Sequence, residues 1–112
     1  MPEYVYIDMT NKEVEQLPRE KTVFFSSISP LETHGPHLPI GTDIFIAEHL
    51  RDRMAKAFLE KHPDINAVYL PTLPLGADAI PPAGSFQLEA SAIETTLLGW
   101  GRTLTKLGFK YW

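Results

Sequence analysis

Residues 30–43 have the sequence PLETHGPHLPIGTD, and this stretch indicates how the chain around it is organised. Its prolines and glycines restrict the path of a loop and lower the entropy lost when that loop becomes ordered. A β-branched and aromatic run at residues 22–28 (TVFFSSI) precedes it and is typical of a buried strand. The stretch therefore predicts a loop that connects a strand to a helix. Its side chains that can bind a metal ion are Glu32, His34, His37 and Asp43.

The loop is followed by a predicted helix over residues 43–61. Thr42 is its candidate N-cap, and Pro63 should end it. Apolar residues recur in this segment at helical spacing, which predicts that one face of the helix is buried. These residues are Ile44, Ala47, Leu50, Met54 and Phe58.

Two further helices are predicted from their end signals. Thr10 and Glu13 form a capping-box pattern that should open a short helix before Pro18. A longer helix should cover residues 89–106, with Gly108 at the position after its last turn.

The order of these elements favours an α/β fold with a mainly parallel sheet. Residues 66–70 (NAVYL) predict a second strand, and residues 109–112 predict the start of a third. The loop at 29–42 and the Pro- and Gly-rich loop at 71–84 both follow strands, so both should lie at the carboxyl edge of the sheet, where sites form in such folds. We expect residues 1–112 to form one domain, and the short final strand suggests a piece of a longer protein.

Composition excludes several classes of partner. Charged residues make up 21% of the chain and the net charge is −4, without the basic patch that nucleic acid binding requires. No apolar run approaches the roughly 20 residues that cross a bilayer, and the N-terminus does not resemble a signal peptide. A cytoplasmic protein without a membrane or nucleic acid partner is therefore expected. With no cysteine, any metal must be held by His, Asp or Glu, which favours ions such as zinc and manganese.

The spacing of three residues in the loop suits a site with two metal ions. Side chains two positions apart in an extended segment point the same way, and their Cα atoms are roughly 6.5–7 Å apart. Glu32 and His34 have this spacing and could bind neighbouring ions, which in two-metal sites lie about 3.5–4 Å apart. Asp43 follows at the start of a helix, where its two oxygens could bridge both ions and where the helix dipole also favours an acid.

The same stretch resembles the signature of the creatininase family, Glu-x-His-Gly-Pro-His-Leu-Pro-x-Gly-Thr-Asp, and matches each of its fixed positions. The resemblance implies the N-terminal part of a three-layer α/β/α domain and a metal-dependent amidohydrolase. It implies two divalent ions, zinc and/or manganese, with Glu32 on one, His34 on the other and Asp43 bridging them. The expected reaction is hydrolysis of a non-peptide C–N bond in a small cyclic amide or formamide, in a homo-oligomer. Catalytic residues cannot be assigned from the motif.

The chain departs from the family pattern at two places. The family follows its third strand with Asn-Gly-His-Gly-Gly-Asn, a source of further metal ligands, and this chain ends before that motif. Many members also carry a His and a Pro-Gly-Thr in the loop after the second strand, where this chain has Ala83-Gly84-Ser85 and no His. The alternative function is therefore a non-catalytic fragment, or a small-molecule or metal-binding domain, of the same fold. A sugar-phosphate or nucleotide binder ranks last, because no phosphate-binding loop is recognisable.

Several other polar residues have a structural role as their simpler interpretation. His37 could orient a metal ligand from outside the site or pack within the loop. Asp78 favours a turn, with a substrate contact as the alternative. Ser85 is expected in a turn or helix cap rather than as a nucleophile, because no base is paired with it in the sequence. His49 should be solvated on the polar face of its helix.

Overall fold

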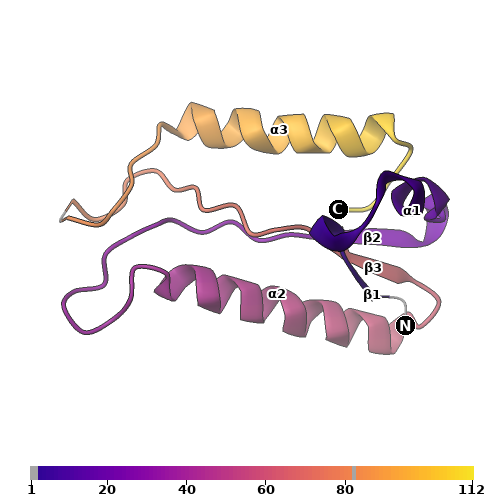
Figure 1. Ribbon diagram of the computed structural model, residues 1–112, viewed down its shortest axis with the longest axis horizontal. Helices are drawn as coiled ribbons and strands as arrows, with labels where there is room; N and C mark the ends of the chain where they lie inside the picture. Colours follow the sequence, from indigo (N-terminus) through magenta and orange to yellow (C-terminus); the bar gives the residue numbers. More distant parts are fainter. Residues whose placement is uncertain (1–2, 82) are drawn as a thin grey trace.

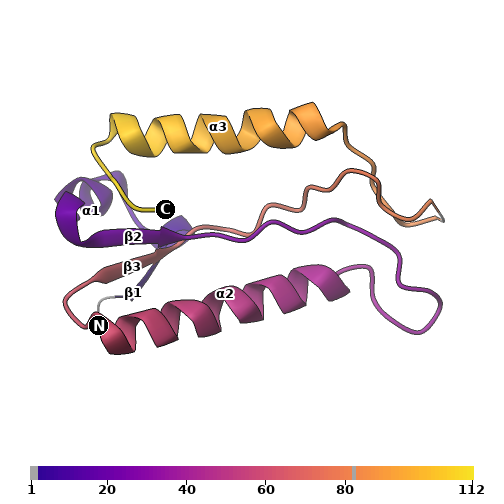
Figure 2. The same cartoon turned by 180° about the vertical axis from the view of Figure 1, so that it is seen from behind.

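The computed structural model describes residues 3–81 and 83–112, and it has the three-layer α/β/α arrangement. The sheet lies between two long helices, α2 on one side and α3 on the other (Figures 1 and 2). The elements in chain order are β1 (Glu3–Val5), η1 (Tyr6–Asp8), α1 (Asn11–Gln16), η2 (Arg19–Lys21), β2 (Thr22–Phe25), α2 (Thr42–Lys61), β3 (Asn66–Tyr69) and α3 (Ala90–Lys106).

The sheet is parallel and has the strand order β1-β3-β2. In the register of the sheet, Tyr69 at the end of β3 is paired with Val5 of β1 on one side and with Phe25 of β2 on the other. Strand β1 was not predicted from the sequence. Strand β2 is shorter than the predicted 22–28. The expected strand at 109–112 is present as one parallel bridge, between Tyr111 and Val23 on the free edge of β2.

Helix α1 begins with the predicted capping box. The Thr10 N–H donates to the Glu13 carboxylate at 2.7 Å, and the Glu13 N–H donates to the Thr10 hydroxyl at 3.3 Å. The helix ends before Pro18, as expected. Arg19 then donates to carbonyl groups at the end of α1 and to the Leu107 carbonyl after α3, at 3.0 Å. One guanidinium group therefore joins the ends of two helices.

Two predictions about helix α2, its N-cap and its buried face, were wrong. Its N-cap is Gly41, because the Thr42 hydroxyl donates to the Pro39 carbonyl at 2.6 Å instead of accepting a helix N–H. The predicted apolar face is also displaced. Leu50 and Met54 are 52% and 68% exposed, whereas Ala55 is fully buried. Arg51 lies instead on the side of the helix that faces the sheet, where its guanidinium donates to the Leu70 carbonyl at 2.8 Å.

The main hydrophobic core lies between the sheet and helices α1 and α3. Phe24 and Phe109 meet edge to face within it, with ring centroids 4.8 Å apart. Helix α3 ends as predicted, with Gly108 at φ 89° after the C-cap Leu107. On the other face of the sheet, Phe25 packs against Phe58 of α2. The residues of the core cluster are Leu17, Phe24, Val68, Leu70, Leu104 and Phe109.

Candidate metal centre

Two loops leave the carboxyl edge of the sheet and run side by side away from it (Figures 1 and 2). The first, residues 26–41, follows β2 and contains all but the last two residues of the PLETHGPHLPIGTD stretch, which begin α2. The second, residues 70–89, follows β3. Near their base they are paired like strands, because the Ser29 N–H donates to the Leu73 carbonyl at 3.0 Å and the Leu73 N–H donates to the Ser27 carbonyl at 2.9 Å. The loops therefore extend the parallel sheet before they separate from it.

Farther out, the second loop contacts three consecutive residues of the first. The Phe86 N–H donates to the Leu31 carbonyl at 2.9 Å. The Ile80 N–H donates to Oε2 of Glu32 at 2.7 Å, and the Thr33 N–H donates to the Ser85 hydroxyl at 2.9 Å. These contacts hold the segment that carries the candidate ligands.

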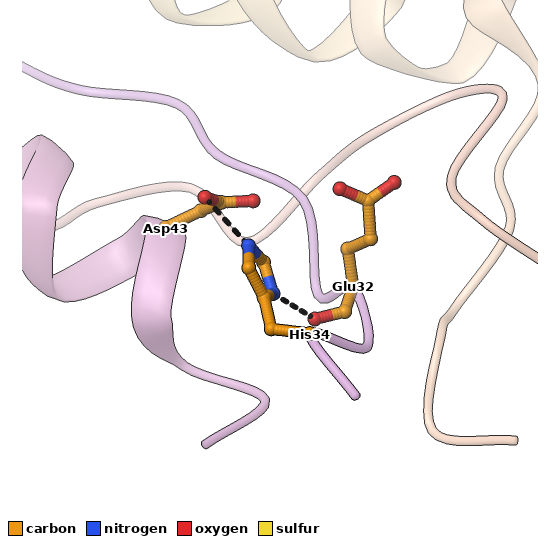
Figure 3. Close-up of side chains that lie close together, drawn as sticks. All are labelled: Glu32, His34 and Asp43. Atoms are coloured by element: carbon orange, nitrogen blue, oxygen red, sulfur yellow. Dashed lines mark hydrogen bonds and ion pairs between the residues drawn. The ribbon is translucent and has the colours of Figure 1, made fainter. Parts of the chain in front are cut away.

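Glu32, His34 and Asp43 converge, as their spacing predicted. Each offers a ligand atom, and these atoms lie within 4.8 Å of one another. Glu32 and His34 belong to the loop, and Asp43 lies in the first turn of α2 (Figure 3). The side chains of His34 and Asp43 are 23% and 32% exposed, so the cluster is partly shielded and still open to a small ligand.

Hydrogen bonds orient the His34 ring toward this cluster. Nδ1 lies 2.9 Å from the Glu32 carbonyl oxygen, and Nε2 lies 3.1 Å from Oδ1 of Asp43 (Figure 3). The carbonyl requires a proton on Nδ1, which leaves Nε2 to face the carboxylate. The hydrogen bond to the Glu32 backbone raises the pKa of His34, desolvation opposes that effect, and the charge of Asp43 adds to it.

This donor set fits a divalent cation. A metal-binding histidine usually donates its other ring N–H to a carbonyl or carboxylate, which fixes the tautomer, and Nδ1 of His34 does so here. Its Nε2 and the carboxylates of Asp43 and Glu32 then remain as nitrogen and oxygen ligands. Such a set suits zinc and manganese.

The remaining candidate residues lie outside this cluster. His37 is exposed near the tip of the first loop, and its ring lies against Gly35. Asp78 has φ 58°, the left-handed conformation of a turn, in agreement with its simpler interpretation. Ser85 accepts the Thr33 N–H and does not cap α3, whose N-cap is Glu89. His49 is exposed, as expected.

Nothing in the sequence indicated that the second loop contacts the side chain of a candidate ligand. That contact is made by the Ile80 backbone N–H, 48 positions from Glu32. The adjoining residue, Ala79, is held by the side chain of Gln87. Neither position has a residue type that signals a metal site, and only the spacing of the two loops in three dimensions reveals the contact.

Comparison with known proteins finds one family. The family model described as "Creatininase: Creatinine amidohydrolase" matches residues 7–112. Two similar solved structures, "Creatininase Mn" and "Crystal structure of creatinine amidohydrolase (creatininase)", each have a TM-score of 0.79 at 21% sequence identity. A tryptophan-to-alanine mutant creatininase has a TM-score of 0.75 at 22% identity. In each comparison 96% of this chain is covered but only 42% of the other, so the chain spans less than half their length.

No curated protein matches the sequence significantly. Among the described residues, no helix combines the length and the apolar character needed to cross a membrane.

Proposed function

The chain belongs to the creatininase family, and on that premise we propose that it carries part of the site of a metal-dependent amidohydrolase. The substrate would be a small molecule with a non-peptide C–N bond, of the cyclic amide or formamide type. The observation that carries this proposal is the convergence of Glu32, His34 and Asp43, whose ligand atoms lie within 4.8 Å of one another at the carboxyl edge of the sheet. Residues 1–112 would be one domain that forms the N-terminal part of a longer family domain.

Two divalent ions, zinc and/or manganese, would be held here, with Glu32 on one, His34 on the other and Asp43 shared. When bound, such ions polarise a substrate carbonyl and lower the pKa of water. The chain's own residues would prepare the site for them. The Glu32 carbonyl holds the Nδ1 proton of His34, so that Nε2 faces Asp43. Asp43 is fixed by the first turn of α2. Asp78 is the candidate contact for substrate, and His37 is the candidate for orienting a metal ligand from outside the site.

The alternative is a metal-binding or small-molecule-binding domain without catalysis. The size of the ligand set favours it. Three residues, one of them shared, would give each of two ions only two protein ligands, whereas catalytic zinc usually has about three. Further ligands would have to come from outside this chain. A homo-oligomer in the cytoplasm remains our expectation, and the exposed Ile46 and Leu50, which are neighbours on one side of α2, are consistent with self-association.

Metal content after purification without chelators tests the proposal. We would compare the unchanged chain with Asp43→Ala and with Glu60→Ala, which removes an exposed acid from the last turn of the same helix. We expect zinc or manganese at near-stoichiometric amounts in the unchanged chain and in Glu60→Ala, and its loss in Asp43→Ala. Metal-free protein in all three would refute the metal centre.

Activity then separates the two functions. A chain loaded with metal would be incubated with creatinine and with small formamides, and release of the hydrolysis product would be measured. Turnover that Asp43→Ala abolishes and Glu60→Ala retains supports the amidohydrolase. Stoichiometric metal without turnover favours the binding domain.

A further inference from the structure

We propose that Gln87 is a positioning residue for Glu32, acting through the peptide group that joins Ala79 to Ile80. This inference rests on the proposed metal centre, because Glu32 is one of its ligands. It adds a residue from the second loop, 55 positions away from the carboxylate that it would orient.

The side-chain amide of Gln87 makes two hydrogen bonds to the backbone of Ala79. Its Oε1 accepts the Ala79 N–H at 3.0 Å, and its Nε2 donates to the Ala79 carbonyl. The next N–H along the chain, that of Ile80, donates to Oε2 of Glu32 at 2.7 Å. Gln87 and Glu32 therefore bind opposite ends of a single peptide group.

The geometry of that peptide group couples the two contacts. A trans peptide is planar, so its C=O and N–H point in opposite directions and turn together. The described chain contains no cis peptide bond. Fixing the Ala79 carbonyl on Gln87 therefore fixes the direction of the Ile80 N–H. Donation to the carbonyl also polarises the peptide, which strengthens the N–H as a donor to a carboxylate.

The turn needs such support. Asp78, directly before Ala79, has φ 58°, a left-handed conformation that aspartate tolerates better than most residues but that still depends on its surroundings. Ala79 is buried, so its backbone groups need hydrogen-bond partners, and Gln87 supplies them. Without the Gln87 amide, the turn would lose both constraints on the orientation of its next N–H.

The consequence for the site is a restricted Glu32 carboxylate. Oε2 is engaged by Ile80, so the carboxylate has fewer rotamers available. Ordering these rotamers in advance lowers the entropy cost of binding. The other contacts described between the outer parts of the two loops, Phe86 to Leu31 and Thr33 to Ser85, involve the first loop only through its backbone. The Ile80 contact reaches a ligand side chain directly.

Amide hydrogen exchange of the metal-free protein tests the positioning itself. Ile80 is 52% exposed, so its N–H should owe its protection to Glu32. We expect Gln87→Leu to accelerate exchange at Ile80 at least about tenfold, as Glu32→Ala should. Gln87→Glu, which keeps the shape but loses the donor, should do the same. Gln16→Leu, at the other glutamine of the chain, should not. Unchanged exchange at Ile80 in Gln87→Leu would overturn the inference.

Titration with Mn²⁺ tests the effect on the site. Replacing a group that orients a metal ligand typically weakens binding about 10- to 100-fold, and we expect about tenfold for Gln87→Leu. In a Glu32→Ala background the same change should have no further effect, because the route through Glu32 is gone. Equal weakening in both backgrounds would overturn the inference and assign Gln87 to general loop packing. If the unchanged chain binds no Mn²⁺ while the exchange pattern holds, the proposed function fails and the positioning stands.

Discussion

Replacing Gly76 by alanine should separate the two loops that form the candidate site. Gly76 lies in the second loop against Pro30, the first residue of the PLETHGPHLPIGTD stretch. A Cβ at position 76 would lie 2.4 Å from the Pro30 Cβ and 2.9 Å from the Pro30 Cα. Carbon atoms that are not bonded prefer about 3.5–4.0 Å, so one backbone must move by about 1 Å. Such overpacking costs about 1–3 kcal/mol of the free energy of unfolding.

Gly99 provides the matched control, because the same substitution there should have the opposite sign. It lies in the middle of α3, and no heavy atom outside the local helix backbone would lie within 4 Å of an added Cβ. Alanine there only reduces the conformational freedom of the unfolded chain and should stabilise the helix by about 0.5–1 kcal/mol.

Thermal unfolding followed by circular dichroism measures both effects. The entropy of unfolding is about 2.1 cal/mol/K per residue, so 1 kcal/mol corresponds to about 4 °C for a chain of this length. Gly76→Ala should lower Tm by about 4–12 °C, and Gly99→Ala should raise it by about 2–4 °C. Gly76→Ala should also weaken Mn²⁺ binding, because the displaced loop carries the Ile80 N–H that contacts Glu32. A Gly76→Ala protein with unchanged Tm and Mn²⁺ affinity would show that the loops are not packed as described.

Two further predictions concern protons and caps. The pKa of His34 is raised, first by the backbone of Glu32 and also by Asp43, so a proton competes with a metal ion for Nε2. Mn²⁺ affinity measured by titration should therefore rise with pH through the raised pKa of His34 and then level off. Over the same pH range, the metal-free chain should lose the stabilisation that protonated His34 provides. A pH-independent Mn²⁺ affinity would contradict this prediction. Thr10→Ala should lower the free energy of unfolding by about 1 kcal/mol, because the Glu13 N–H loses its acceptor; a Tm within error of the unchanged chain would show that the cap contributes nothing.

Features set by neighbours in the chain could be predicted from the sequence. The capping box of α1 and the left-handed Gly108 after α3 both depend on residues within one or two helical turns. The same holds for the convergence of Glu32, His34 and Asp43, because the whole loop that joins them is 12 residues long. In these places local chemistry and the final structure agree.

Features that depend on distant partners could not be predicted. Strand β1 has three residues, too few for a period to be visible, and it exists because β3, more than 60 positions later, pairs with it. The apolar spacing along α2 predicted that Leu50 and Met54 face the core, but both are exposed, and Arg51 instead contacts the Leu70 carbonyl directly after β3. No property of the helix by itself indicates where that carbonyl lies.

The hydrogen bond from Ile80 to Glu32 is another feature that depends on a distant part of the chain. The group at position 80 that contacts Glu32 is a backbone N–H, which every residue except proline has. Two prolines follow directly at positions 81 and 82, so within this turn Ile80 is the last residue able to donate. The identity of its side chain is unconstrained by the contact, and residue types that signal metal binding are absent there. A sequence can therefore indicate which candidate metal ligands come together and still give no indication of the peptide group that contacts one of them.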